Sequence, residues 1–198
     1  RAAVCIAFLT ALMAALTGFA SLEADCQGIS DKVLRLHILA NSDSGEDQAL
    51  KIQVRDRVLQ ESQALFTASQ NKQEAMAQVQ QRLPDLQRIA QEEVYAQGYD
   101  YPVTVGLSQT YFPTKQYDTV TFPAGQYDAL QIRIGEAQGQ NWWCVLFPSL
   151  CVPAASGVQM DDVLDASELD LVEHGQAYQV KFKVVEWYEG FMDWLGSW

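Results

Sequence analysis

Histidine and basic side chains are scarce in this 198-residue chain. It has two histidines, and its 13 Lys and Arg residues stand against 25 Asp and Glu residues, for a formal net charge of −12. The basic residues form no run, which excludes the electrostatic footprint of a nucleic-acid-binding protein. The same charge balance disfavours adhesion to anionic lipid headgroups by charge alone. We therefore expect no nucleic-acid partner.

The sequence also lacks the common signatures of cofactor and metal sites. It contains no phosphate-binding loop, no dinucleotide-binding fingerprint and no serine-centred nucleophile elbow. Its one acidic cluster, Asp43, Glu46 and Asp47, does not have the glycine and glutamate spacing of an EF-hand. These acids are better explained as favourable charges at a helix N-terminus. With two histidines and one weak cluster, we expect no metal and no cofactor.

The composition that is present is that of a globular protein. Hydrophobic residues make up 48% of the chain, aromatic residues 11% and charged residues 19%. These fractions fit neither a disordered chain nor a polytopic membrane protein. The length suits one domain of ordinary size with appendages, and it leaves ample chain for a hydrophobic core.

The first part of the chain has the pattern of a targeting segment. After Arg1, residues 2–20 are mostly apolar and carry no charge, as in the apolar region of a secretory signal. We therefore predict export, with residues 1–24 serving as a signal peptide or signal anchor. A stretch of this length just suffices to span a bilayer, so membrane contact is expected here. Small residues at Gly18 and Ala20 favour cleavage after Ala20, whereas an aspartate before Cys26 disfavours lipidation there.

Apolar periodicity then predicts a strand followed by a helix. Residues 32–39 alternate as a strand with one strongly apolar face. Turn-forming residues follow at 41–45. Ser44, with Asp47 three positions later, predicts a helix start of the capping-box type, and apolar side chains at helical spacing continue from there.

A second helical region is predicted to begin near Asn71. Pro84 marks a kink or the first turn of a further helix, and Gly98 is a natural stop. Beyond Gly98 the apolar period changes to two. It predicts four more strands, at 103–107, 119–122, 127–134 and 142–147.

Short connections between these strands favour antiparallel neighbours. We therefore predict an α+β fold, with an antiparallel sheet of about four to five strands, two or three helices packed on one face, and a C-terminal amphipathic helix. In this scheme residues 32–151 form a single α+β domain. Residues 152–178, rich in Ala, Ser, Gly, Asp and Glu, are a linker, and 179–198 are the C-terminal amphipathic segment.

Two stretches resemble one known protein family. The first reads LHILANSDS at residues 36–44 and continues to Val54–Asp56. The second comprises FPTK at 112–115, FPAGQY at 122–127 and NWWCVLFPSLC at 141–151. Together they resemble the stage II sporulation protein R family over residues 32–151. Serine at position 149, where many members have proline, is a small departure.

The resemblance implies a signalling role in endospore formation. Members of the family are made in the forespore and exported into the space between the forespore and mother-cell membranes. There they switch on a membrane-embedded aspartic protease of the mother cell, which cleaves the precursor of sigma factor E. The family is not established as an enzyme, so we expect no catalytic residues in this chain.

We expect the partner-facing surface to lie in the 112–127 turns and the 141–151 segment. Aromatic side chains are favoured at protein interfaces, and the consecutive tryptophans in the second segment should point to opposite faces of their strand. The candidate residues are Phe112, Pro113, Lys115, Phe122, Pro123, Tyr127, Asn141, Trp142 and Trp143.

The cysteines and tryptophans leave alternatives open. An oxidising exterior permits a Cys144–Cys151 disulfide, which would stabilise the fold by about 2–3 kcal/mol. Two buried thiols that pack as small apolar residues are an equal alternative. A secreted cysteine-dependent hydrolase would use Cys144 with His37 as its base, although a histidine in a strand is more often structural. A module that binds envelope glycan or lipid through exposed tryptophans is the third possibility.

Overall fold

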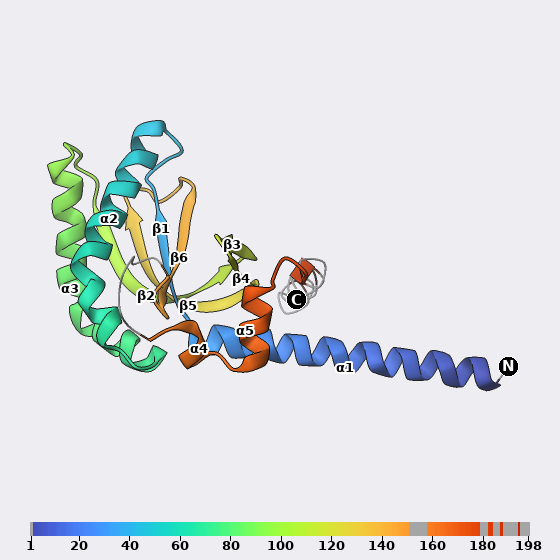
Figure 1. Cartoon of the computed structure of the whole chain (residues 1–198). Coiled ribbons are helices and arrows are strands. Elements are labelled where there is room, and N and C mark those ends of the chain that lie inside the picture. The colour runs from blue at the N-terminus through green and yellow to red at the C-terminus, as the bar shows by residue number, and fades with distance from the viewer. Residues whose placement is uncertain (1, 151–157, 179–181, 184–186, 188–193, 195–198) are drawn as a thin grey trace. The chain divides into compact units, whose positions relative to one another are not determined.

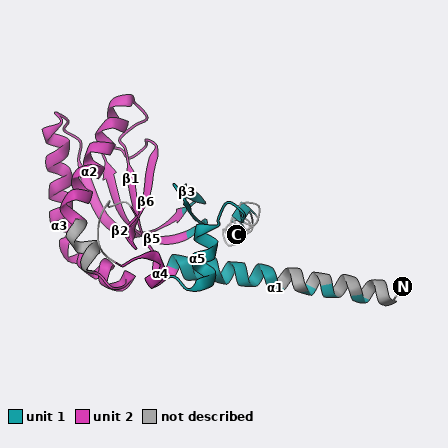
Figure 2. Ribbon diagram, in the orientation of Figure 1, with its two compact units in different colours: residues 1–30, 112–125, 164–198 teal, residues 31–111, 126–163 magenta. Residues whose placement is uncertain are grey.

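The computed structural model describes residues 2–150, 158–178, 182, 183, 187 and 194, with backbone only for parts of 2–16 and for 63–68. The chain divides into two compact units (Figure 2). The smaller unit comprises residues 1–30, 112–125 and 164–198, and the larger comprises 31–111 and 126–163. Each unit is described by itself.

A four-stranded mixed sheet forms the centre of the larger unit (Figure 1). Its strand order is β2-β5-β1-β6. The strands are β1 (Leu34–Leu39), β2 (Val103–Phe112), β5 (Gly125–Ile134) and β6 (Asn141–Phe147). The predicted α+β class is confirmed, with helices on one face of a sheet.

The expectation of a wholly antiparallel sheet is wrong for one strand pair. β1 pairs antiparallel with β6, but it pairs parallel with β5. Parallel neighbours need a long connection, and residues 40–124 provide one between these two strands. The predicted strand at 119–122 is also outside this sheet. Its residues form β4 (Val120–Phe122), which pairs antiparallel with β3 (Lys115–Tyr117) in a separate ribbon.

Two long helices, α2 (Gly45–Ala68) and α3 (Lys72–Ala96), cover one face of the sheet (Figure 1). The predicted start of α2 is confirmed, because the Ser44 side chain accepts a hydrogen bond from the Asp47 N–H. Asn71 caps α3 in the same way. Pro84 lies inside α3 and starts no new helix. Gly98, with a φ of +84°, follows the end of α3, as expected for a glycine stop signal.

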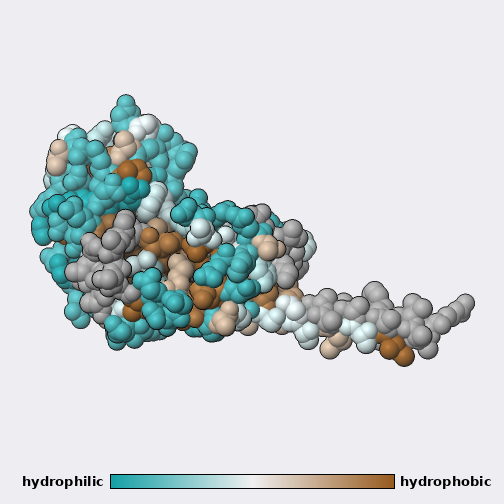
Figure 3. Space-filling model, in the orientation of Figure 1, coloured by the Kyte–Doolittle hydropathy of each residue, from teal (hydrophilic) through white to brown (hydrophobic). Residues whose placement is uncertain are grey.

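The core of the larger unit lies between this sheet face and the two helices. Leu34, Leu36 and Ile38 of β1 are fully buried there, because alternate strand residues point to the same face. They pack in one cluster with the apolar stripes of α2 and α3. In the view of Figure 3, hydrophilic side chains cover most of the surface over α2 and α3. The helices thus bury one side each and expose the other.

The smaller unit contains α1 (Ala2–Lys32, apart from its last two residues), the β3–β4 ribbon and α5 (Ala166–Glu173). Leu22, Cys26 and Ile29 of α1 are buried. The Ser167 hydroxyl of α5 donates a hydrogen bond to Asp25 at 3.0 Å, so the C-terminal turns of α1 pack as part of this unit. Among the helices that the structure describes, none is both long and apolar enough to cross a bilayer.

Part of the stretch expected as a linker is helical. It contains α4 (Met160–Val163) and α5, and α5 begins with a reciprocal capping box between Asp165 and Glu168. Of the expected C-terminal amphipathic segment, 182, 183, 187 and 194 are described, and all four are helical. The rest of 179–198 lies outside the described residues.

Candidate functional site

The loop after β1, which belongs to the first sequence stretch, meets the turn before β6 at one end of the larger unit's sheet. The loop after β1 hydrogen-bonds the turn before β6: the Glu136 N–H donates to Asn41 Oδ1 at 3.0 Å, and the Gln140 N–H donates to Asp43 Oδ1 at 2.7 Å. Gly135 has a φ of +58°, and the Asn41 side chain fills the space that a Cβ would need. We call residues 40–51 with 135–141 the loop clamp.

Asp47 is the centre of the loop clamp. It is 4% exposed, and its Oδ2 accepts hydrogen bonds from Asn41 Nδ2 at 2.9 Å and Ser42 Oγ at 2.5 Å. Burial alone would raise the pKa of Asp47, but hydrogen bonds from Ser42, Asn41 and Tyr101 outweigh it, and the pKa is lowered. The carboxylate therefore stays ionised and ties the loop to the start of α2.

Lys51 completes the loop clamp from the next turn of α2. Its Nζ donates to the backbone oxygen of Gln140 at 2.8 Å and to Gln48 Oε1 at 2.6 Å. Burial lowers the pKa of this ammonium, and the nearby Asp43 opposes that shift. The polar residues of the first stretch thus hold the β1–α2 loop against the β6 entry, which is a positioning role.

The two tryptophans of β6 point to opposite faces of the sheet, as predicted. Trp142 faces the helices, where the Arg55 guanidinium lies 4.8 Å from its ring centroid, a cation–π distance. Arg55 also pairs with Asp56 at 2.6 Å. Trp143 lies on the other face, with its ring 6.1 Å from that of His37. Both indoles are half-buried.

His37 is enclosed by polar side chains on the face away from the helices. Its Nδ1 lies 3.2 Å from Gln131 Nε2, and its Nε2 lies 2.7 Å from Asn141 Oδ1. Since the Gln131 amide nitrogen only donates, Nδ1 accepts and Nε2 carries the proton. Burial lowers the pKa of His37, and Arg133 adds to that effect against the opposing Asn141 hydrogen bond. The imidazole is therefore a neutral, fully bonded structural group.

The structure does not assemble the alternative Cys144–His37 pair. Cys144 is opposite Leu36 in the ladder, whereas His37 is opposite Trp143, so the cysteine and the imidazole lie on opposite faces of the sheet. Cys144 is also disulfide-bonded, which removes the thiolate that a nucleophile needs. Cys151 lies outside the described residues, and its pairing with Cys144 stays a prediction.

The predicted partner-facing residues differ widely in exposure. Lys115 and Asn141 are exposed, and Pro113, Trp142 and Trp143 are half-buried. The other four are buried and cannot offer their side chains to a partner: Phe112, Phe122, Pro123 and Tyr127. Tyr127 instead packs under the buried guanidinium of Arg35, 4.8 Å from its ring centroid. Arg35 Nε also donates to the Cys144 carbonyl at 3.2 Å.

The sequence alone did not predict the roles of Gln131, which contacts His37, and of Arg35, which contacts Tyr127 and the Cys144 carbonyl. Their roles depend on the parallel register of β1 with β5, which places Gln131 beside His37, and no local pattern encodes that register. Within the described residues no group of three or more His, Cys, Asp and Glu side chains is arranged to hold a metal ion.

Comparison with known proteins supports the family resemblance of the two sequence stretches. The family model for stage II sporulation protein R matches residues 30–157. Stage II sporulation protein R of Bacillus subtilis (strain 168) is 34% identical over 212 residues, an alignment that covers 93% of this chain and 95% of the relative. No solved structure matches the chain. The chain belongs to the stage II sporulation protein R family.

Proposed function

We propose that this protein is an exported sporulation signal that activates a membrane-embedded aspartic protease of the mother cell. Through that protease it drives processing of the sigma factor E precursor and couples forespore to mother-cell gene expression. The observation that carries the proposal is the family match over residues 30–157. It is supported by the uncharged segment 2–20, which suits export into the space between the two membranes.

The proposed mechanism is binding. A protein without catalytic chemistry can activate a protease only if it binds the active state more tightly than the inactive one. Such a surface must be preorganised, because ordering it on binding costs free energy. The hydrogen bonds of the loop clamp and the stacked Arg55 hold Trp142 and the exposed Asn141 in place. Of the residues proposed to face the partner, Asn141 and Lys115 are exposed and Pro113, Trp142 and Trp143 are half-buried, with the two tryptophans on opposite faces of the sheet.

Co-expression tests the proposal directly. The full chain, the protease and the sigma factor precursor are produced together in a host that does not sporulate, and precursor cleavage is followed by immunoblot. Cleavage should appear only when all three are present. Equal cleavage with and without this chain contradicts the proposed activation.

A charge substitution at the surface sharpens that assay. Lys115→Glu should weaken activation, because Lys115 is exposed in the proposed surface. Arg88→Glu is the matched control: it makes the same charge change at an exposed position on α3, far in sequence from either candidate segment. If both variants activate equally, the 112–127 turns are not part of the surface.

The same assay separates a signal protein from a cysteine-dependent hydrolase. Cys144→Ser and His37→Gln should each keep most of the activation, provided that circular dichroism shows a folded chain. A hydrolase would lose all activity with either change. Loss of cleavage in both folded variants therefore counts against the binding mechanism.

A further inference from the structure

Strand β2 is one of the two outer strands of the larger unit's sheet, and it is long and uncharged. Its ten residues, VTVGLSQTYF, contain no Lys, Arg, Asp, Glu or Pro. Charged residues and prolines on edge strands normally prevent two sheets from joining edge to edge. In a chain of net charge −12, this uncharged edge is a place where two copies could meet without repulsion between strands.

Two glutamines of α3 occupy the position of a neighbouring strand along the first part of this edge, at residues 101–105. The Val103 N–H donates to Gln91 Oε1 at 2.8 Å, and Gln91 Nε2 donates to the Tyr101 carbonyl at 2.9 Å. One carboxamide thus supplies both the acceptor and the donor that an adjacent strand would supply. One helical turn earlier, Gln87 Oε1 accepts from the Val105 N–H at 3.4 Å.

These groups belong to the outer edge of β2 and not to its paired side. Backbone groups of alternate strand residues point to the same side. The carbonyl of Pro102 accepts from the Gly135 N–H, at the end of β5, at 2.9 Å, so residue 102 faces β5. Tyr101, Val103 and Val105 consequently face outward, toward Gln87 and Gln91.

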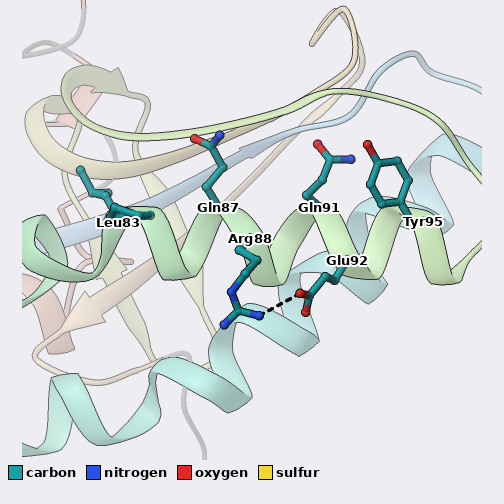
Figure 4. A pocket seen from close by; sticks show the side chains of 7 residues that line it. Leu83, Gln87, Arg88, Gln91, Glu92 and Tyr95 are labelled. Atoms are coloured by element: carbon teal, nitrogen blue, oxygen red, sulfur yellow. Dashed lines mark hydrogen bonds and ion pairs between the residues drawn. The ribbon is translucent and has the colours of Figure 1, made fainter.

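The rise per residue of a helix and of a strand explains why two glutamines of α3 can reach two N–H groups of β2. Four helix residues rise about 6 Å, and two strand residues rise about 6.6 Å. Glutamines at i and i+4 of α3 can therefore reach N–H groups at j and j−2 of β2 when the two elements run antiparallel. Gln87 and Gln91 project from the same side of α3, beside a hollow of about 540 Å³ that is also lined by Leu83 and Tyr95 (Figure 4).

We propose that Gln87 and Gln91 close the N-terminal part of the outer edge of β2 against pairing with β2 of a second copy of this chain. The two carboxamides satisfy backbone groups that would otherwise be available to an incoming strand, and they take up the space that strand would need. The inference concerns self-association only and does not depend on the proposed signalling function.

The test is the oligomeric state of Gln87→Ala/Gln91→Ala. The control is Gln80→Ala/Gln81→Ala, which makes the same composition change at two exposed positions of α3. All chains are full-length and are compared in the same mild non-ionic detergent by light scattering over a concentration series. The native chain and the control should stay monomeric, whereas the double variant should reach about twice the monomer mass, as in a two-fold dimer, or more.

Hydrogen exchange supplies an independent measure of the opened edge. In dilute samples, where the variant is monomeric, the amides of Val103 and Val105 should exchange faster than in the control, because they have lost their acceptors. If Gln87→Ala/Gln91→Ala fails to fold, Gln87→Ala alone carries the same mass test. A folded variant that stays monomeric at every concentration overturns the proposal, as does equal self-association of the native chain.

Discussion

At the scale of single residues, the polar side chains of the loop clamp are structural, and Asp47 contributes most. Asp47→Ala leaves the part-buried donors of Asn41 and Ser42 without their acceptor. We expect it to lower the free energy of unfolding by about 2–3 kcal/mol. Urea unfolding measures the loss. Asp85→Ala, at an exposed ion pair of α3, is the control and should change stability by about 0.5 kcal/mol or less.

His37 gives the fold a pH dependence of predictable sign. Its folded-state pKa lies below the ordinary 6.5, so the unfolded chain binds more protons and stability falls as the pH drops below about 6.5. His37→Gln should remove this part of the pH dependence between about pH 7.5 and 5. His174→Gln makes the same substitution at the exposed histidine and is the matched control. If the free energy of unfolding changes equally with pH in the native and His37→Gln chains, the lowered pKa of His37 is contradicted.

At the scale of elements, α1 joins the predicted targeting segment to the folded smaller unit. A chain starting at Ser21 keeps the buried Leu22, whereas a chain starting at Asp25 loses it. We expect the shorter chain to be less stable by about 1.5–3 kcal/mol, the value of one buried leucine. Chemical denaturation of the two truncated chains measures the difference, and Leu22→Ala in the longer one should reproduce most of it. Equal denaturation midpoints for the two truncated chains would show that burial of Leu22 does not contribute to stability.

The elements also show what local sequence does and does not encode. Ser44 predicts the start of α2 because a cap and its helix are adjacent in the chain. The parallel pairing of β1 with β5 was not predictable, because it joins residues about 90 positions apart. Helix α5 was missed although Asp165 and Glu168 have capping-box spacing, because the surrounding Ala, Ser and Gly favour a linker. Gln131 was missed as a partner of His37 because it lies beside His37 only in the β1–β5 register.

At the scale of the whole molecule, the net charge predicts how the chain without its first 20 residues behaves toward membranes. Removing residues 1–20 takes away only Arg1 from the charged residues, which leaves 12 basic against 25 acidic residues, or −13. We expect this truncated chain to stay in solution when vesicles rich in phosphatidylglycerol are sedimented, because like charges repel. The full chain should sediment with them through its apolar segment. Sedimentation of both chains would reveal a second membrane-binding surface.

The continuity of α1 bears on the predicted cleavage of the targeting segment. The predicted cut after Ala20 lies only two residues before Leu22, the first buried residue of α1 among those whose side chains the structure describes, and within one turn of a single helix. A peptidase reads its substrate as an extended chain, so cutting and docking compete for the same backbone. We therefore predict that cleavage after Ala20 precedes completion of the smaller unit or waits for that turn to unwind, so that faster docking of α1 leaves a smaller fraction of the protein cleaved.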